Sequence, residues 1–253
     1  MKQSKGRMVA VVGPTGSGKT KLAIHLAKKF NGVIISADSR QVYRGLDIGT
    51  NKEGTPGRCD DQPCRTIDGI GQLLIDIVDP GERFTLHDWL LQARYWLEPI
   101  MEKGQLPIIV GGTGLYVTAL LEGYKLGGGR GAKNNQAVDF ESLILMPDID
   151  RVVLNEKSDK RFVKIFDDLI AETKRLLESG VSDEWLEKIG LDYRYAHRNV
   201  SGQLSRKEAI EQFQTASRQY IRRQITWWRH HGKVHTPASA AEASSLVSRF
   251  LKG

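Results

Sequence analysis

The chain has 253 residues, 40% of them hydrophobic and 26% charged, which is the composition of a folded globular protein and excludes disordered, collagen-like and coiled-coil chains. The length fits one large domain or one domain with an appendage. The net charge of +7 is compatible with a polyanionic partner, and no apolar run reaches the ~18 residues of a membrane span. We expect a monomeric, cytoplasmic protein.

Short apolar runs predict the strands. Residues 8–12 lead into a glycine loop, and the apolar spacing over residues 19–30 predicts a helix after it. Further apolar runs at 33–35, 106–110 and 143–146 end in polar, glycine-rich or turn segments. Buried strands that alternate with helices indicate a parallel α/β sheet, whose ligands bind at the carboxyl ends of the strands.

The second half of the chain has a helical pattern. Residues 151–177 and 205–228 are amphipathic, and Ser205 and Glu208 have capping-box spacing. The stretch GGGRGAKNNQ before them has little to bury and reads as a linker. We expect an α/β core over 1–126, a glycine-rich linker over 127–139, and the last core strand with C-terminal helices over 140–253.

Residues 13–20, GPTGSGKT, match the phosphate-loop pattern G-x-x-x-x-G-K-[ST] between a strand and a helix. Backbone N–H groups of such a loop wrap a phosphate chain, Lys19 neutralises it, and the Thr20 hydroxyl holds Mg²⁺. The motif predicts a P-loop NTPase-like sheet, but it does not say whether ATP or another molecule carries the phosphates. The expected phosphate-binding residues are Gly13, Pro14, Thr15, Gly16, Ser17, Gly18, Lys19 and Thr20.

Two further loops follow strands and are expected beside the phosphate loop. Asp38 could act as a general base, bind the metal through water, or cap the next turn. Ser39 and Gln41 suit base edges but are equally typical of a solvated surface. Thr113, in the GGTGLY loop, could point into the same cleft or simply start a helix.

The segment 218–235 carries five basic residues and no acidic residue. Arginines interleaved with aromatic residues suit phosphate contacts and stacking on unpaired bases, and a helix with an aromatic core face and a basic solvated face has the same pattern. Residues 193–197, YRYAH, have the same ambiguity. The basic residues are Arg218, Arg222, Arg223, Arg229 and Lys233.

Cys59 and Cys64 are the two cysteines. Nothing nearby completes a tetrahedral zinc site, and a reducing cytosol disfavours a stable disulfide. We expect two ordinary thiols in a loop.

Together, GPTGSGKT, SADSRQVYRGLDIGTNK, LIDIVDP with FTLHDW, LPIIVGGTGLY and RQYIRRQITWWR resemble the tRNA dimethylallyltransferase family in content and order. The resemblance implies transfer of a dimethylallyl group from dimethylallyl diphosphate to the exocyclic amine of the adenosine 3′ of the tRNA anticodon, with Mg²⁺. It implies that Asp38 is the base, with Thr113 as a nearby hydrogen-bonding partner, and that Lys19 and Arg223 hold the diphosphate. Asp38, Ser39, Arg40, Gln41, Arg218, Arg222 and Arg229 are implied to contact tRNA.

The chain departs from the family pattern in two places. The helical insertion expected after GGTGLY is replaced by the glycine-rich stretch, and IGQLLID lacks the expected histidines before LID. Three alternatives stay open: prenylation of free adenine nucleotides, a P-loop kinase of a small metabolite, and a tRNA-binding protein with impaired turnover.

Overall fold

The computed structural model describes residues 6–124 and 140–253, so the expected linker over 127–139 lies outside the described residues. Strands and helices alternate through the first half, and helices dominate the second. In chain order the elements are β1 (Gly6–Val12), α1 (Lys19–Phe30), β2 (Gly32–Ser36), β3 (Thr55–Cys59), β4 (Gln62–Ile67), β5 (Ile70–Leu73), α2 (Leu86–Glu102), β6 (Leu106–Gly111), α3 (Gly114–Leu121), β7 (Phe140–Leu145), α4 (Arg151–Glu178), α5 (Asp183–Ile189), α6 (Leu191–Val200), α7 (Arg206–His230), β8 (Val234–His235) and α8 (Ala240–Lys252).

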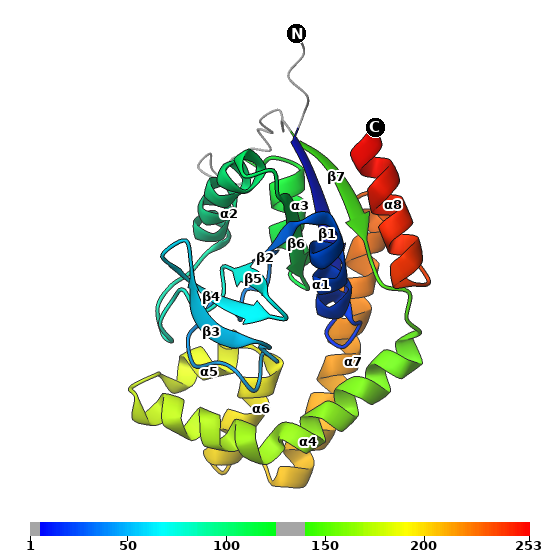
Figure 1. Cartoon of the computed structure of the whole chain (residues 1–253). Helices are drawn as coiled ribbons and strands as arrows, with labels where there is room; N and C mark the ends of the chain where they lie inside the picture. The colour runs from blue at the N-terminus through cyan, green and yellow to red at the C-terminus, as the bar shows by residue number, and fades with distance from the viewer. Residues whose placement is uncertain (1–5, 125–139) are drawn as a thin grey trace.

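One sheet carries all the described strands, in the order β3-β4-β5-β2-β6-β1-β7-β8 (Figure 1). Along this order, β5, β2, β6, β1, β7 and β8 pair in parallel. At the other end, β3 pairs antiparallel with β4, and β4 pairs antiparallel with β5. The loops after β1, β2 and β6 therefore leave the same edge of the sheet. That edge is where a parallel sheet binds ligands.

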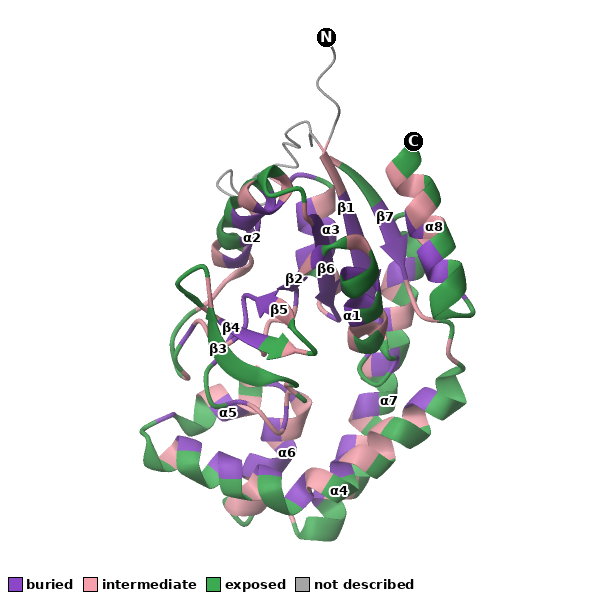
Figure 2. Cartoon of the chain, viewed as in Figure 1, coloured by how far each residue is buried: buried purple, intermediate pink, exposed green. Residues whose placement is uncertain are grey.

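Helices cover both faces of the sheet (Figures 1 and 2). α2 and α3 pack on one face around Trp89 and Tyr116, and α1 and α8 pack on the other around Leu26 and Val247. A third core lies among α4, α5, α6 and α7 and includes Phe162 and Phe213. This helical part also buries Val42 and Leu46, so it is joined to the loop that follows β2.

The parallel α/β fold predicted from the sequence is confirmed. The predicted strands correspond to β1, β2, β6 and β7, and the predicted helices to α1, α4 and α7. Ser205 caps α7, and Glu208 completes the expected capping box. The apolar pattern of the sequence does not predict β3, β4, β5, β8 or the helices α2, α5, α6 and α8.

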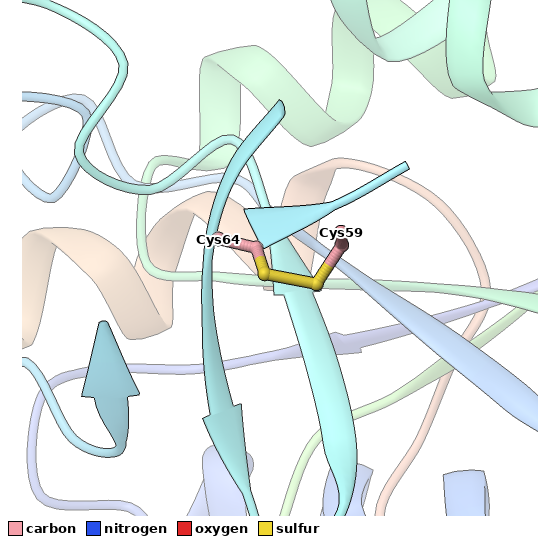
Figure 3. The surroundings of a disulfide bond; sticks show 2 residues. All are labelled: Cys59 and Cys64. Carbon is pink, nitrogen blue, oxygen red and sulfur yellow. A yellow bond between two sulfur atoms is a disulfide. The ribbon is translucent and has the colours of Figure 1, made fainter. Parts of the chain in front are cut away.

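The expectation of two free thiols in a loop was wrong. Cys59 and Cys64 form a disulfide with a Cα–Cα distance of 5.8 Å (Figure 3). Cys59 ends β3 and Cys64 lies in β4, and antiparallel pairing places them across the hairpin. The spacing CDDQPC gave no strand pattern, yet the hairpin fixes the two cysteines within bonding range.

Among the helices within 6–124 and 140–253, none is long and apolar enough to cross a membrane.

Candidate active site

The glycine loop between β1 and α1 is shaped for an anion. Gly13, Gly16 and Gly18 have φ angles of 138°, 81° and 84°, and Gly18 caps α1 without a side-chain hydrogen bond. The buried Ser17 hydroxyl has no partner within the described residues. A helix start without a side-chain cap leaves its first N–H groups available for a phosphate.

A cavity of ≈ 270 Å³ lies beside this loop. Lys19, Thr20, Asp38 and Gln41, which the sequence singled out, all line it. Of the other expected phosphate-binding residues, the lining includes Thr15, Gly16 and Gly18 but not Gly13, Pro14 and Ser17. The structure therefore brings the residues after β1 and the residues after β2 to one cavity.

Lys19 is the half-buried cation of this cavity. Burial lowers the pKa of Lys19 from its ordinary value of 10.5, and the carboxylates of Asp38 and Glu53 oppose that shift. Arg161 of α4 lowers the pKa further. A bound diphosphate would favour the charged ammonium, because an anion in the cavity offsets the cost of burying the cation.

Asp38 follows β2 and has two sides with different surroundings. One oxygen, Oδ1, accepts backbone N–H bonds from Arg40 at 3.0 Å and Gln41 at 3.4 Å. The structure records no hydrogen bond to the other oxygen, Oδ2, from any described residue. The turn-capping interpretation thus holds for Oδ1, and Oδ2 can still accept a proton in the cavity.

Thr113 joins the GGTGLY loop to the loop of Asp38. Its hydroxyl oxygen accepts the backbone N–H of Ser39 at 3.1 Å and donates toward the Ser39 hydroxyl at 3.4 Å. Its partner is thus the residue after Asp38 and not Asp38 itself. The two loops also touch at Gly111, where an added Cβ would lie 2.1 Å from the Ala37 carbonyl oxygen.

The Gln41 amide is held inside the protein. Its Oε1 accepts from the buried Ser36 hydroxyl at 3.3 Å, and its Nε2 donates to the Thr50 carbonyl at 3.1 Å. Both ends of the amide are therefore occupied, which fixes the wall of the cavity. A tRNA contact through Gln41 would require one of these bonds to exchange.

Helix α4 holds the segment 47–50 from outside. The buried Glu172 carboxylate accepts backbone N–H bonds from Asp47 at 2.9 Å and Ile48 at 3.0 Å, and the Tyr193 hydroxyl donates to it at 2.5 Å. Arg161 donates to the carbonyl oxygens of Ile48 and Gly49 at 3.0 and 2.8 Å. Burial and the neighbouring Glu172 carboxylate raise the pKa of Tyr193 well above its usual range, so the Tyr193 hydroxyl stays protonated as a donor.

The arginines of α7 divide between two places. Arg223 and Arg40 lie on the ring of Tyr220, 5.7 and 5.2 Å from its centroid, so Arg223 approaches the loop of Asp38. Arg222 and Arg229 line a second cavity of ≈ 660 Å³ with Asp148. Within the described chain, none of these four arginines lines the phosphate-loop cavity.

Arg218 and the tryptophans of α7 have structural partners. Arg218 pairs with Asp159 of α4 at 2.6 Å. Trp228 is 3% exposed, and the Trp227 indole N–H donates to the Thr118 hydroxyl at 3.1 Å. The aromatic core-face interpretation therefore holds for both tryptophans.

The YRYAH cluster is also part of the core. Tyr193 and His197 are buried, and the His197 ring lies against Asp183 at 2.6 Å and Glu187 at 3.1 Å. The His197 contacts join α6 to α5.

Several residues at the site belong to none of the motifs in the sequence. Glu53 and Gln72 line the phosphate-loop cavity, and Lys157 of α4 has its Cβ 3.9 Å from the position that a Cβ on Gly16 would take. The spacing of Lys157 and Arg161, one turn apart on an amphipathic helix, was the available signal. Gln72 and Glu53 belong to no motif; the sheet order places Gln72 here, and the loop between β2 and β3 places Glu53.

The comparisons with known proteins agree on one family. A model of the IPP transferase family matches residues 41–138 and 129–231, and an isopentenyl transferase model matches residues 6–58. The tRNA dimethylallyltransferase of Streptococcus gordonii is 33% identical over 280 aligned positions, covering 91% of this chain and 92% of the relative. Because 280 positions exceed the 253 residues of the chain, the relative has residues without a counterpart here. The tRNA dimethylallyltransferase 1 of Geotalea daltonii is 30% identical, with 93% and 92% covered.

Solved structures show the same architecture. The tRNA delta(2)-isopentenylpyrophosphate transferase of Staphylococcus epidermidis superposes with a TM-score of 0.82 at 26% identity, covering 98% of this chain and 99% of the other. The full-length tRNA isopentenylpyrophosphate transferase of Bacillus halodurans gives 0.80 at 29%, with 98% and 96% covered. These matches agree with the position of the cavity after β1 and β2. The chain therefore belongs to the IPP transferase family.

Proposed function

We propose that this protein transfers a dimethylallyl group from dimethylallyl diphosphate to the exocyclic amine of the adenosine 3′ of the anticodon in tRNA. The observation that carries the proposal is the single cavity that Lys19 and Asp38 line together. The Lys19 ammonium suits a diphosphate leaving group, and the Asp38 carboxylate suits the proton that leaves an attacking amine. Relatives named for this reaction match nearly the whole chain.

The reaction is a substitution at the allylic carbon. The amine nitrogen forms a bond to that carbon, and the bond from the carbon to the diphosphate oxygen breaks. The proton lost by the nitrogen passes to Asp38, whose Oδ1 stays fixed by the N–H groups of Arg40 and Gln41. Lys19 and the loop N–H groups stabilise the charge that develops on the diphosphate.

Mg²⁺ belongs to the proposal as a cofactor that neutralises the diphosphate. Within the described residues, no group of three or more His, Cys, Asp or Glu side chains could hold a metal ion by itself. That fits Mg²⁺, which keeps several waters and binds substrate phosphates with few protein ligands. Thr20 would hold it, since this hydroxyl lies at the start of α1 and lines the cavity.

The tRNA would approach from the side of α7. Arg40 and Arg223, stacked on Tyr220, present two cations beside Ser39 and the Asp38 turn. The target base must leave its stack to reach the cavity, and an unpaired anticodon loop lowers that cost. The proposal includes contacts from Arg218, Arg222 and Arg229 along the same helix, and a cytoplasmic monomer as the working form.

Labelled dimethylallyl diphosphate with Mg²⁺ tests the proposal against its alternatives. Unmodified anticodon stem-loop RNA, AMP and no acceptor are offered separately, and the label is followed into each. Label in RNA alone is the expected result. Label in AMP would move the function to nucleotide prenylation, and RNA binding without label in either acceptor would favour a binding protein.

A phosphate-transfer assay with ATP addresses the kinase alternative. The expected result is no phosphate transfer from ATP to a small acceptor under conditions in which RNA is prenylated.

A further inference from the structure

We propose that Gln72 of β5 is a further binding residue of the donor pocket, and that its side-chain amide donates a hydrogen bond to an oxygen of the diphosphate. The inference rests on the proposed function, which supplies the prenyl diphosphate. Gln72 is only 6% exposed, and it lines the same cavity as Lys19 and Thr20.

The amide of Gln72 lacks a partner in the protein. Its Nε2 is buried without a hydrogen-bond acceptor anywhere in the described chain. A buried amide N–H without an acceptor lowers stability, and native proteins retain few such groups. A group of this kind in a ligand cavity points to an acceptor on the ligand.

The neighbouring strands explain why the protein does not satisfy this amide. Gln72 pairs with Ile34 on β2 and with Arg65 on β4. Ile34 is apolar, and the Arg65 guanidinium is a donor that is already bound to Asp47 at 2.7 Å and to Asp76 at 2.6 Å. Neither neighbour in register therefore offers an acceptor to the amide N–H.

The chemistry of dimethylallyl diphosphate identifies the hydrogen-bond acceptor for the Gln72 amide. The dimethylallyl group is a hydrocarbon, so every hydrogen-bond acceptor of this substrate belongs to its diphosphate. Lys19, Lys21, Thr15 and Thr20 of the same cavity are also donors or cations suited to phosphate oxygens, whereas the carboxylates of Asp38 and Glu53 are acceptors. Gln72 thus extends the phosphate-binding set from the glycine loop to β5.

Two near-isosteric variants test this inference by calorimetric titration of Mg²⁺ and inorganic diphosphate. Gln72→Met removes the donor, and we expect diphosphate to bind about ten-fold more weakly, which is about 1.4 kcal/mol. The melting temperature should stay the same or rise, because the unpaired buried amide is gone. Gln72→Glu replaces a donor with an anion, and we expect a larger loss of affinity.

Gln105→Met is the matched control, since Gln105 precedes β6 and lines a different cavity with Trp96. We expect it to bind diphosphate like the wild type. Unchanged affinity in Gln72→Met would overturn the inference. So would a rise in KM for RNA with unchanged diphosphate affinity, because the amide would then contact the acceptor base.

The titration separates this inference from the proposed function, since it needs no turnover. A wild type that binds diphosphate through Gln72 but prenylates no RNA would leave the inference standing and refute the function. If the wild type transfers the label to RNA but Gln72→Met binds diphosphate normally, the proposed function would stand and the inference about Gln72 would be refuted.

Discussion

Asp38 combines a structural and a chemical task in one carboxylate. Its Oδ1 caps the turn through Arg40 and Gln41, and the carboxylate lines the cavity that Lys19 enters. A substitution that removes the whole group would disturb both tasks. The two can be separated by a side chain that still accepts hydrogen bonds but cannot take up a proton.

Asp38→Asn is that substitution. Its amide oxygen can still cap the turn, so we expect the fold and the affinity for stem-loop RNA to change less than two-fold while transfer falls by at least about 10²-fold. Asp38→Ala should also abolish transfer and leave RNA binding nearly intact. Single-turnover assays and RNA titrations measure the two effects, with Asp68→Asn as an exposed control. Transfer at the wild-type rate in Asp38→Asn would rule out the base assignment.

The buried Lys19 ammonium lowers the stability of the fold and favours the binding of an anionic ligand. Burial lowers its pKa from 10.5, so the cost of burying the ammonium is fully present below the lowered pKa. That cost fades as pH rises through the lowered pKa toward 10.5, where the unfolded chain also loses its proton.

Without ligand, Lys19→Met should therefore raise the free energy of unfolding at about pH 7 and raise it less at about pH 10. The same variant should lose diphosphate binding. Urea unfolding at the two pH values and calorimetry check both effects, with Lys28→Met, an exposed residue on the same helix, as the control. A destabilised Lys19→Met would contradict this account of the cavity.

At the scale of elements, α4 acts on the cavity wall without lining the cavity itself. Glu172 receives N–H groups and Arg161 donates to carbonyl oxygens of the same segment. The segment continues into Thr50, whose carbonyl holds Gln41. The far end of α4 thus supports the turn that carries Asp38.

Glu172→Gln should lower the free energy of unfolding by about 3 kcal/mol, because an uncharged amide satisfies fewer of these buried donors. Urea denaturation measures the loss. Glu178→Gln, at the exposed end of the same helix, is the control and should change stability by less than about 0.5 kcal/mol. Equal stability of the two variants would show that the bonds to the segment 47–49 contribute little.

The β3–β4 hairpin depends on the Cys59–Cys64 disulfide. The bond joins residues five apart in sequence, and closing so short a loop is worth about 2 kcal/mol in the chain-entropy description. We expect a reductant to lower the free energy of unfolding of the wild type by about that amount. A Cys59→Ala/Cys64→Ala double variant should not respond to reductant, and an equal response would show that the effect arises elsewhere.

At the scale of the whole molecule, the excess of basic residues bears on tRNA affinity. Each phosphate neutralised on a single strand contributes about −0.7 to the slope of log affinity against log salt. We expect binding of the stem-loop to weaken steeply with salt, and Arg222→Gln to make the slope shallower by about 0.7. Arg58→Gln in the β3–β4 hairpin, away from α7, should leave the slope unchanged. A flat response in the wild type would argue against arginine contacts to the phosphates.

The sequence predicts the parallel core because its strands are continuous apolar runs and α1 and α7 carry clear helical patterns. It does not predict β3, whose residues TPGRC include proline and glycine and are largely exposed. The cysteine pairing was missed for the same reason. Motifs identified Lys19, Thr20 and Asp38. Gln72 reaches the cavity only through the order of the strands, and Glu172 supports the cavity wall only through the packing of α4.

The close approach at the GGTGLY loop has a consequence for mutational tolerance. An added Cβ would lie 2.1 Å from the Ala37 backbone at Gly111, 2.8 Å from the Gln224 amide at Gly112 and 2.5 Å from the Trp227 indole at Gly114. Gly111 thus abuts the loop after β2, and Gly112 and Gly114 abut α7. In a library of all single substitutions selected for activity, Gly111 and Gly114 should be depleted as strongly as Asp38, although glycine has no side chain to take part in the reaction. Gly112 should be depleted less, because the Gln224 amide is the end of a flexible side chain.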